Sequence, residues 1–363
     1  MLREYIVSEA MHALGVPTTR ALAAVSTGAT VHRQEALPGA VLTRVAASHI
    51  RVGTFEFFAA RQDTEALAAL VEHVLARHYP GADAEDHPAL TLLGGAIERQ
   101  AQLIAKWQLL GFIHGVMNTD NCLVSGETID YGPCAFMEGF DPATVFSSID
   151  RKGRYAYGNQ PRIAAWNLTS LAQALMPLLA QQDDESLLQQ RAQDLLESFE
   201  PQFHQAYWQG LRAKLGLQVD SDDDDALLQE FLALLSETRS DFTLSFRHLA
   251  DLADASLPQE QKVPFSFAPA FDPWLSSWRK RLALESRPAS AIQRAMHAIS
   301  PALIPRNHLV EEAIDRATHD EHFCAFHDLV DALRKPFAYD SSLKAFVTPA
   351  RPEQVVSQTF CGT

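Results

Sequence analysis

The amino-acid sequence predicts an α+β fold that is mostly α-helical, and three observations support this prediction. The chain opens with an amphipathic helical pattern over residues 3–14. Residues 21–60 are then rich in short β-type segments separated by Gly and Pro turns. Beyond about residue 62 the apolar periodicity is mostly that of helices. We therefore expect residues 1–62 to form a small helix-plus-strand unit and residues 63–363 to form a helical body.

The individual elements follow from local patterns. The first helix should stop at Gly15, because Pro17 follows closely and this combination is typical of a helix C-terminus. The expected strands are residues 21–26, 30–33 and 41–46. The expected helices of the body include residues 64–78, 89–110, 164–180, 186–215 and 309–316.

The composition is typical of a globular protein and argues against several functional classes. Of the 363 residues, 47% are hydrophobic and 21% are charged, unlike a disordered chain. The formal net charge of −15 argues against a nucleic-acid partner, which requires a concentrated basic surface. The sequence contains no run of about 18 apolar residues and no signal peptide, so we expect no membrane partner and a cytoplasmic location. Nothing in the sequence specifies the oligomeric state.

One short segment carries the strongest chemical pattern. It reads HGVMNTDN over residues 114–121 and Asp-Tyr-Gly over residues 130–132. Protein kinases carry His-Arg-Asp, four further residues and Asn, followed by Asp-Phe-Gly. There the first Asp receives the substrate proton, while the Asn and the second Asp hold Mg²⁺. Here the His-to-Asn spacing is kept and the metal-binding pair, Asn121 and Asp130, is present, but Val116 replaces the proton acceptor.

The residues between these two motifs predict a tight β-hairpin. Residues 122–124 and 128–130 would be its strands, and residues 125–127 would form its turn. Such a hairpin would bring Asn121 and Asp130 to the same edge. An amide oxygen and a carboxylate oxygen placed together suit Mg²⁺, which completes its coordination with phosphate and water.

Several long strings of unusual composition extend the pattern beyond this loop. They are REY and SEAM at residues 3–5 and 8–11, GVPTTRA at 15–21, SHIRVGTFE at 48–56, HGVMNTDN at 114–121, IDYGP at 129–133, NQP and WNL at 159–161 and 166–168, and Cys361 near the end. Together they resemble the selenoprotein O family over essentially the whole chain. The resemblance implies a protein-kinase-like fold, long interpreted as that of a pseudokinase. Residues 1–62 would then belong to the small lobe and residues 63–363 to the helical large lobe, which carries the catalytic loop, the metal site and the C-terminal tail.

The same resemblance implies a protein adenylyltransferase. Such an enzyme binds ATP in a reversed orientation and transfers AMP to Ser, Thr or Tyr hydroxyls of protein substrates, with Mg²⁺ or Mn²⁺ as cofactor. Asp120 resembles the proton acceptor, Asn121 and Asp130 resemble the metal ligands, and Arg44 and Arg51 resemble the arginines that hold the phosphates. In the family, the residue that Asp130 resembles also lies close to the bound ATP. These roles are chemically coherent, because expulsion of pyrophosphate builds up charge that the planar guanidinium fork neutralises well.

Glu4 resembles the helix Glu that pairs with a strand lysine in kinases and orders the nucleotide phosphates. The family's Gly-rich segment and this lysine precede that helix, whereas this sequence has no lysine before Lys106 and no Gly-rich loop of this kind in residues 1–60. We therefore expect an N-terminally truncated chain with an exposed sheet edge and reduced stability. Two alternative functions remain open at this point. The chain could be an inactive pseudokinase fragment that lacks the ATP loop and lysine, or a kinase-type phosphotransferase, as the His114–Asn121 spacing suggests.

The cysteines predict thiol chemistry rather than a zinc site. The four of them, which show no CxxC or His-paired spacing, are Cys122, Cys134, Cys324 and Cys361. Cys361 occupies the place where some family members carry selenocysteine, so it is a candidate redox thiol with Cys134 as its partner. The alternative is an ordinary exposed tail cysteine. We expect Cys122 and Cys324 to be core residues.

Overall fold

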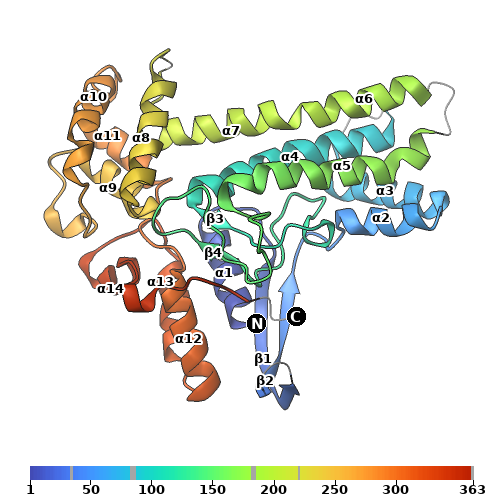
Figure 1. Ribbon diagram of the computed structural model, residues 1–363, viewed down its shortest axis with the longest axis horizontal. Helices are drawn as coiled ribbons and strands as arrows, with labels where there is room; N and C mark the ends of the chain where they lie inside the picture. The colour runs from blue at the N-terminus through green and yellow to red at the C-terminus, as the bar shows by residue number, and fades with distance from the viewer. Residues whose placement is uncertain (33–35, 82–86, 181–184, 220, 361–363) are drawn as a thin grey trace.

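Helices greatly outnumber strands in this protein, as expected for a mostly α-helical α+β fold. The computed structural model describes residues 1–363 apart from 33–35, 82–86, 181–184, 220 and 361–363 (Figure 1). Two antiparallel sheets of two strands each occur in the described parts of the chain. Among the described helices, none combines the length and the apolar character needed to cross a membrane.

The N-terminal part combines one helix, a long hairpin and two further helices. Its elements are α1 (Leu2–Ala13), β1 (Arg20–His32), β2 (Ala36–Val45), α2 (Val52–Ala60) and α3 (Thr64–His78). As expected, α1 ends at a glycine: Gly15 has a φ of +77°, which favours glycine over other residues. β1 includes the expected strands 21–26 and 30–32, while residue 33 lies outside the described residues. β1 pairs with β2 in a hairpin that projects from the helical body (Figure 1).

Residues 52–60, at the end of the segment expected to be rich in strands, form the helix α2, which was not predicted. A short apolar run of this kind is compatible with a strand or a buried helix on its pattern alone. Tertiary packing decides the outcome, because α2 contacts α3 and α5 and buries Phe55 completely. This helix matters for the site, since its first turn lies next to the short 3₁₀ helix η1 (Thr119–Asn121).

The centre of the molecule is built around a long buried helix. The elements here are α4 (Pro88–Leu110), β3 (Phe112–Ile113), β4 (Ala135–Phe136), α5 (Gln160–Leu179), α6 (Glu185–Glu197) and α7 (Phe199–Lys214). α4 packs against α5, α6 and α7, and all of these helices contribute to one apolar core. The expected single helix over residues 186–215 is interrupted at Ser198, which separates α6 from α7. The Ser198 hydroxyl donates to the Leu195 carbonyl at 2.6 Å, and a side-chain hydrogen bond of this kind competes with the backbone hydrogen bonds of a helix.

The C-terminal part adds two smaller helical groups. Its helices are α8 (Asp224–Thr238), α9 (Phe242–Leu252), α10 (Asp272–Leu282), α11 (Ala289–His297), α12 (Asn307–His319), α13 (Cys324–Leu333) and α14 (Lys344–Val347). The expected helix over residues 309–316 lies within α12. The N-terminal helix α1 packs against α12 and α13, and an ion pair between Arg3 and Glu311 connects it to α12. The two ends of the sequence therefore stabilise each other.

The expected hairpin over residues 122–130 does not form. The Gly126 amide does donate to the Leu123 carbonyl at 3.2 Å, so a turn is present at the predicted place. The two arms, however, pair with other segments: Leu123 forms an antiparallel bridge with Arg51, and Thr128 forms a parallel bridge with Thr18. The backbone groups of the two arms thus form hydrogen bonds with segments that are distant in sequence. The residues of the turn carry no information about these distant partners.

Candidate active site

The 114–121 loop begins directly after α4 and β3 and is anchored by a buried histidine. His114 is completely buried, and burial lowers its pKa, so the imidazole is neutral at physiological pH. Its Nε2 lies 2.8 Å from the Ile129 carbonyl oxygen, to which a neutral ring can donate. His114 therefore connects the loop to the residue before Asp130 and acts as a bracing residue, as in kinase catalytic loops.

Two buried amides on α5 hold the backbone of the same loop. The Gln160 side chain accepts from the His114 amide at 2.9 Å and donates to the Phe112 carbonyl at 2.9 Å. The Asn167 side chain donates to the Met117 carbonyl at 3.0 Å. Sequence reasoning assigned no role to these two amides, although both lie within the NQP and WNL strings. The sequence does contain a signal for them, because each is a polar residue on the apolar face of a helix. A residue in such a position needs hydrogen-bond partners in the protein interior.

The two loop residues with expected roles, Asp120 and Asn121, lie on η1. The Asn121 amide nitrogen donates to the Val116 carbonyl at 3.0 Å, and its Oδ1 accepts no hydrogen bond from the described residues. This arrangement leaves an amide oxygen for a cation. Asp120 is solvent-exposed, and its carboxylate lies against Gly53 in the first turn of α2.

The Glu4 side chain connects α1, which carries it, to two other segments of the chain. The carboxylate is largely buried; one oxygen forms an ion pair with Arg44 on β2. The other oxygen accepts from the Tyr131 amide at 2.8 Å. α1, β2 and the 130–132 motif are therefore joined by a single side chain. The cation beside this glutamate is Arg44.

Asp130 has an unusual backbone conformation. Its φ of +67° lies in the left-handed region, which costs a non-glycine residue on the order of 1 kcal/mol, and residues strained in this way cluster at functional sites. The neighbouring hydrogen bonds maintain this conformation, because Glu4 holds the Tyr131 amide and Thr18 hydrogen-bonds the Tyr131 hydroxyl.

Arg51 lies immediately before α2 and offers an unused donor. Its backbone bridges with Leu123, which places it beside the end of η1. Its Nε is buried and has no hydrogen-bond partner among the described residues. A buried, unpaired guanidinium donor is rare in proteins unless a ligand satisfies it. Arg51 therefore fits a phosphate-binding role, because guanidinium groups bind phosphate oxygens strongly.

The cysteines differ in their environments. Cys122 is buried, as expected, and burial raises its pKa to about 12. Cys324 is exposed at the start of α13, so the expectation that it is a core residue is wrong. Cys134 is completely buried and burial raises the pKa of its thiol, which disfavours a reactive thiolate. Cys361 lies outside the described residues, so its pairing with Cys134 stays a prediction.

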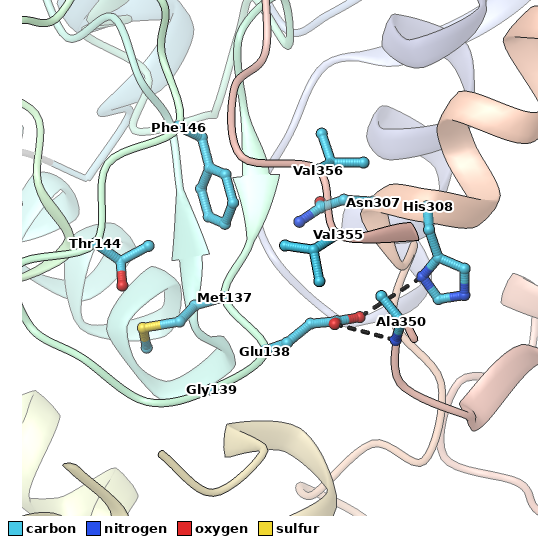
Figure 2. A pocket seen from close by; sticks show the side chains of 10 residues that line it. All are labelled: Met137, Glu138, Gly139, Thr144, Phe146, Asn307, His308, Ala350, Val355 and Val356. Atoms are coloured by element: carbon cyan, nitrogen blue, oxygen red, sulfur yellow. Dashed lines mark hydrogen bonds and ion pairs between the residues drawn. The ribbon is translucent and has the colours of Figure 1, made fainter. Parts of the chain in front are cut away.

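The C-terminal segment covers the chain that follows the Asp130 motif. The Ala350 amide donates to Glu138 at 3.2 Å, and His308 Nδ1 lies 3.8 Å from the same carboxylate (Figure 2). These groups line a cavity of about 130 Å³ together with Val355 and Val356. Further along, the completely buried Thr359 donates from its hydroxyl to the Pro133 carbonyl at 2.5 Å.

Comparison with known proteins places the chain in a family. The model of the family described as protein adenylyltransferase SelO matches residues 1–334. The protein nucleotidyltransferase YdiU of Bradyrhizobium diazoefficiens is 54% identical over 363 residues, and the YdiU of Rhodopseudomonas palustris strain BisB5 is 55% identical over 364 residues. Each alignment covers 100% of this chain and 74% of the relative. The chain therefore belongs to the protein adenylyltransferase SelO family.

Proposed function

We propose that this protein is a protein adenylyltransferase that transfers AMP from ATP to Ser, Thr or Tyr hydroxyls of protein substrates. Membership of the SelO family supports nucleotidyl transfer. The structural observation that carries the proposal is the position of Glu4, which binds Arg44 with one oxygen and the amide next to Asp130 with the other. Glu4 thereby contacts both Arg44, the proposed phosphate-binding cation, and the backbone that directly follows Asp130, the proposed metal ligand.

The proposed fold is protein-kinase-like, with residues 1–62 as part of the small lobe and residues 63–363 as the large lobe. The contact from α1 to the 130–132 motif supports this assignment, because kinases use a helix glutamate near the same motif. The long helix α4 followed by the 114–121 loop supports it as well.

The proposed reaction joins an acceptor oxygen to the α-phosphorus of ATP and breaks the bond from that phosphorus to the bridging oxygen, so that pyrophosphate leaves. Asp120 accepts the proton of the acceptor hydroxyl, as a carboxylate in the loop that replaces the acidic residue missing at Val116. Arg44 and Arg51 neutralise charge on the nucleotide phosphates. Asn121 and Asp130 would hold Mg²⁺ or Mn²⁺, which supplies Lewis-acid stabilisation of the phosphate oxygens when bound.

The residue types at Asn121 and Asp130, one amide and one carboxylate, suit such a cation. Among the described residues no group of three or more His, Cys, Asp or Glu side chains could hold a metal ion. A site with one amide and one carboxylate matches the preference of Mg²⁺ for few protein ligands combined with substrate phosphates. ATP and proteins with accessible hydroxyls are the proposed partners, and the net charge of −15 argues against nucleic acid.

Transfer of label from ATP tests the function. With ATP labelled at the α-phosphate, protein should become labelled, whereas label at the γ-phosphate should not be transferred. The Asp120→Asn variant should lose on the order of 10²-fold or more in rate while still binding ATP. Transfer of γ-label would instead identify a kinase. If neither label is transferred but Asp130→Ala abolishes nucleotide binding, the protein is a nucleotide-binding pseudoenzyme.

A further inference from the structure

The start of α2 is fastened to the end of the 114–121 loop by backbone hydrogen bonds. The Val52 amide donates to the Cys122 carbonyl at 2.9 Å, and the Val124 amide donates to the Ile50 carbonyl at 3.2 Å. These bonds place the first turn of α2 directly beside η1. Gly53 in this turn faces Asp120 of η1.

Gly53 leaves no space for a side chain. A Cβ atom added there would overlap Asp120 Oδ1 and lie 3.3 Å from its Cγ, whereas real Cβ atoms essentially never approach another heavy atom within 3.0 Å. The φ of Gly53 is not among the positive values in the chain. The backbone conformation therefore does not require glycine at this position; only the carboxylate does.

Glycine at this helical position has an energetic cost. In a helix, Gly is less favourable than Ala by about 1 kcal/mol. In return, the carboxylate can approach the N-terminal turn of α2, where the helix dipole favours negative charge. Arg51 lies two residues before Gly53 and directly precedes α2, so the Asp120 carboxylate and this arginine both lie at the start of the helix.

We propose that Gly53 is a positioning residue, which sets the location of the Asp120 carboxylate relative to the acceptor hydroxyl and the phosphate-binding Arg51. This inference rests on the proposed function, in which Asp120 is the base. Gly53 touches neither the acceptor nor the nucleotide in this role and acts through Asp120 alone.

The Gly53→Ala variant tests the proposal. The methyl group meets the free end of a flexible side chain, so Asp120 should move by about 1 Å while the fold is kept. Because displacements of this size at a catalytic group can cost up to about 10²-fold in rate, kcat should fall roughly 10- to 100-fold. The KM for ATP should change by less than about threefold, and the thermal midpoint should stay the same or rise, since Ala favours the helix.

Two further variants separate positioning from a general structural effect. Gly94→Ala is the matched control, because Gly94 also lies in a helix and its added Cβ would meet Leu195 at an ordinary distance of 3.4 Å. Its kcat should stay within about twofold of the parent. In the Asp120→Ala background, Gly53→Ala should cause no additional loss, because residues that act as a unit are not additive.

The outcomes discriminate between this inference and the proposed function. Unchanged kcat in Gly53→Ala, or an equal loss in the Asp120→Ala background, would overturn the positioning role. If the parent protein transfers no α-label, the proposed function is wrong. The position of the Asp120 carboxylate can then still be compared in crystal structures of the parent protein and of Gly53→Ala. An Asp120 carboxylate that stays in place in Gly53→Ala would then refute the positioning role, and a displaced carboxylate would support it.

Discussion

Several of the residues that shape the site are buried polar groups rather than charged ones. Gln160 and Asn167 use amide groups on α5 to hold the backbone at Phe112, His114 and Met117. These contacts restrict the loop without adding charge near the expected metal site. At the scale of single residues, the 114–121 loop is thus positioned by hydrogen bonds whose loss would leave buried backbone groups without partners.

A buried lysine gives the protein a pH-dependent stability. Lys214 is 4% exposed, and burial lowers its pKa to about 7, whereas the ordinary value is 10.5. Between these two pH values the unfolded chain binds more protons than the native state, so the free energy of unfolding rises with pH. Lys214→Met should increase this free energy by on the order of 3 kcal/mol at about pH 7 and by much less near pH 10. Urea denaturation at both pH values measures the difference, and an equal gain at both would contradict the prediction.

At the scale of elements, helix α1 packs against the rest of the protein and also connects β2 to the 130–132 motif through Glu4. Glu4→Gln removes the charge that holds Arg44 but keeps an oxygen for the Tyr131 amide. We expect the KM for ATP to rise roughly 10-fold, equal to about 1.4 kcal/mol, because Arg44 is no longer oriented. Steady-state kinetics with α-labelled ATP measure this change.

The same helix offers a matched control. Glu9 pairs with Arg20 at 2.6 Å, away from the 130–132 motif, so Glu9→Gln should leave the KM for ATP unchanged. An equal rise in both variants would mean that α1 acts only through its general stability.

The β1–β2 hairpin exposes several large apolar side chains. Leu22 and Val41 are 68% and 57% exposed. Exposed apolar strands promote association between chains. Leu22→Thr combined with Val41→Thr should therefore reduce self-association in light scattering, with a thermal midpoint that changes by at most about 3 °C. Leu284→Thr, at a single exposed leucine with 69% exposure outside the hairpin, should not reduce it.

At the scale of the whole molecule, the C-terminal segment stabilises the chain that follows Asp130. Thr359→Val removes the hydroxyl that donates to the buried Pro133 carbonyl. We expect a loss of about 1–3 kcal/mol in stability and faster amide hydrogen exchange in residues 133–148. Mass spectrometry of exchanged peptides measures this effect. Thr348→Val loses a hydroxyl bond to the Lys344 carbonyl at an exposed position, and exchange in residues 133–148 should be unaffected.

The sequence by itself determined the elements whose signals are local. α1 with its end at Gly15, α3 and α4 follow from apolar periodicity, capping residues and glycine, all of which act within a few residues. The motif spacing likewise identified Asn121 and Asp130 as a candidate pair. The burial predicted for Cys324 was wrong and the helix α2 was missed, because apolar neighbours in sequence do not specify which face becomes buried.

Only the tertiary structure decided how the segments meet. The arms of the expected hairpin pair with Arg51 and Thr18, and Glu4 reaches both Arg44 and the 130–132 motif, because backbone and charged groups find their best partners among all segments of the folded chain. The close approach of Gly53 to Asp120 is likewise invisible in the sequence, since it exists only where α2 and η1 pack together. Local patterns specify the elements of this protein, whereas contacts between distant segments specify its candidate active site.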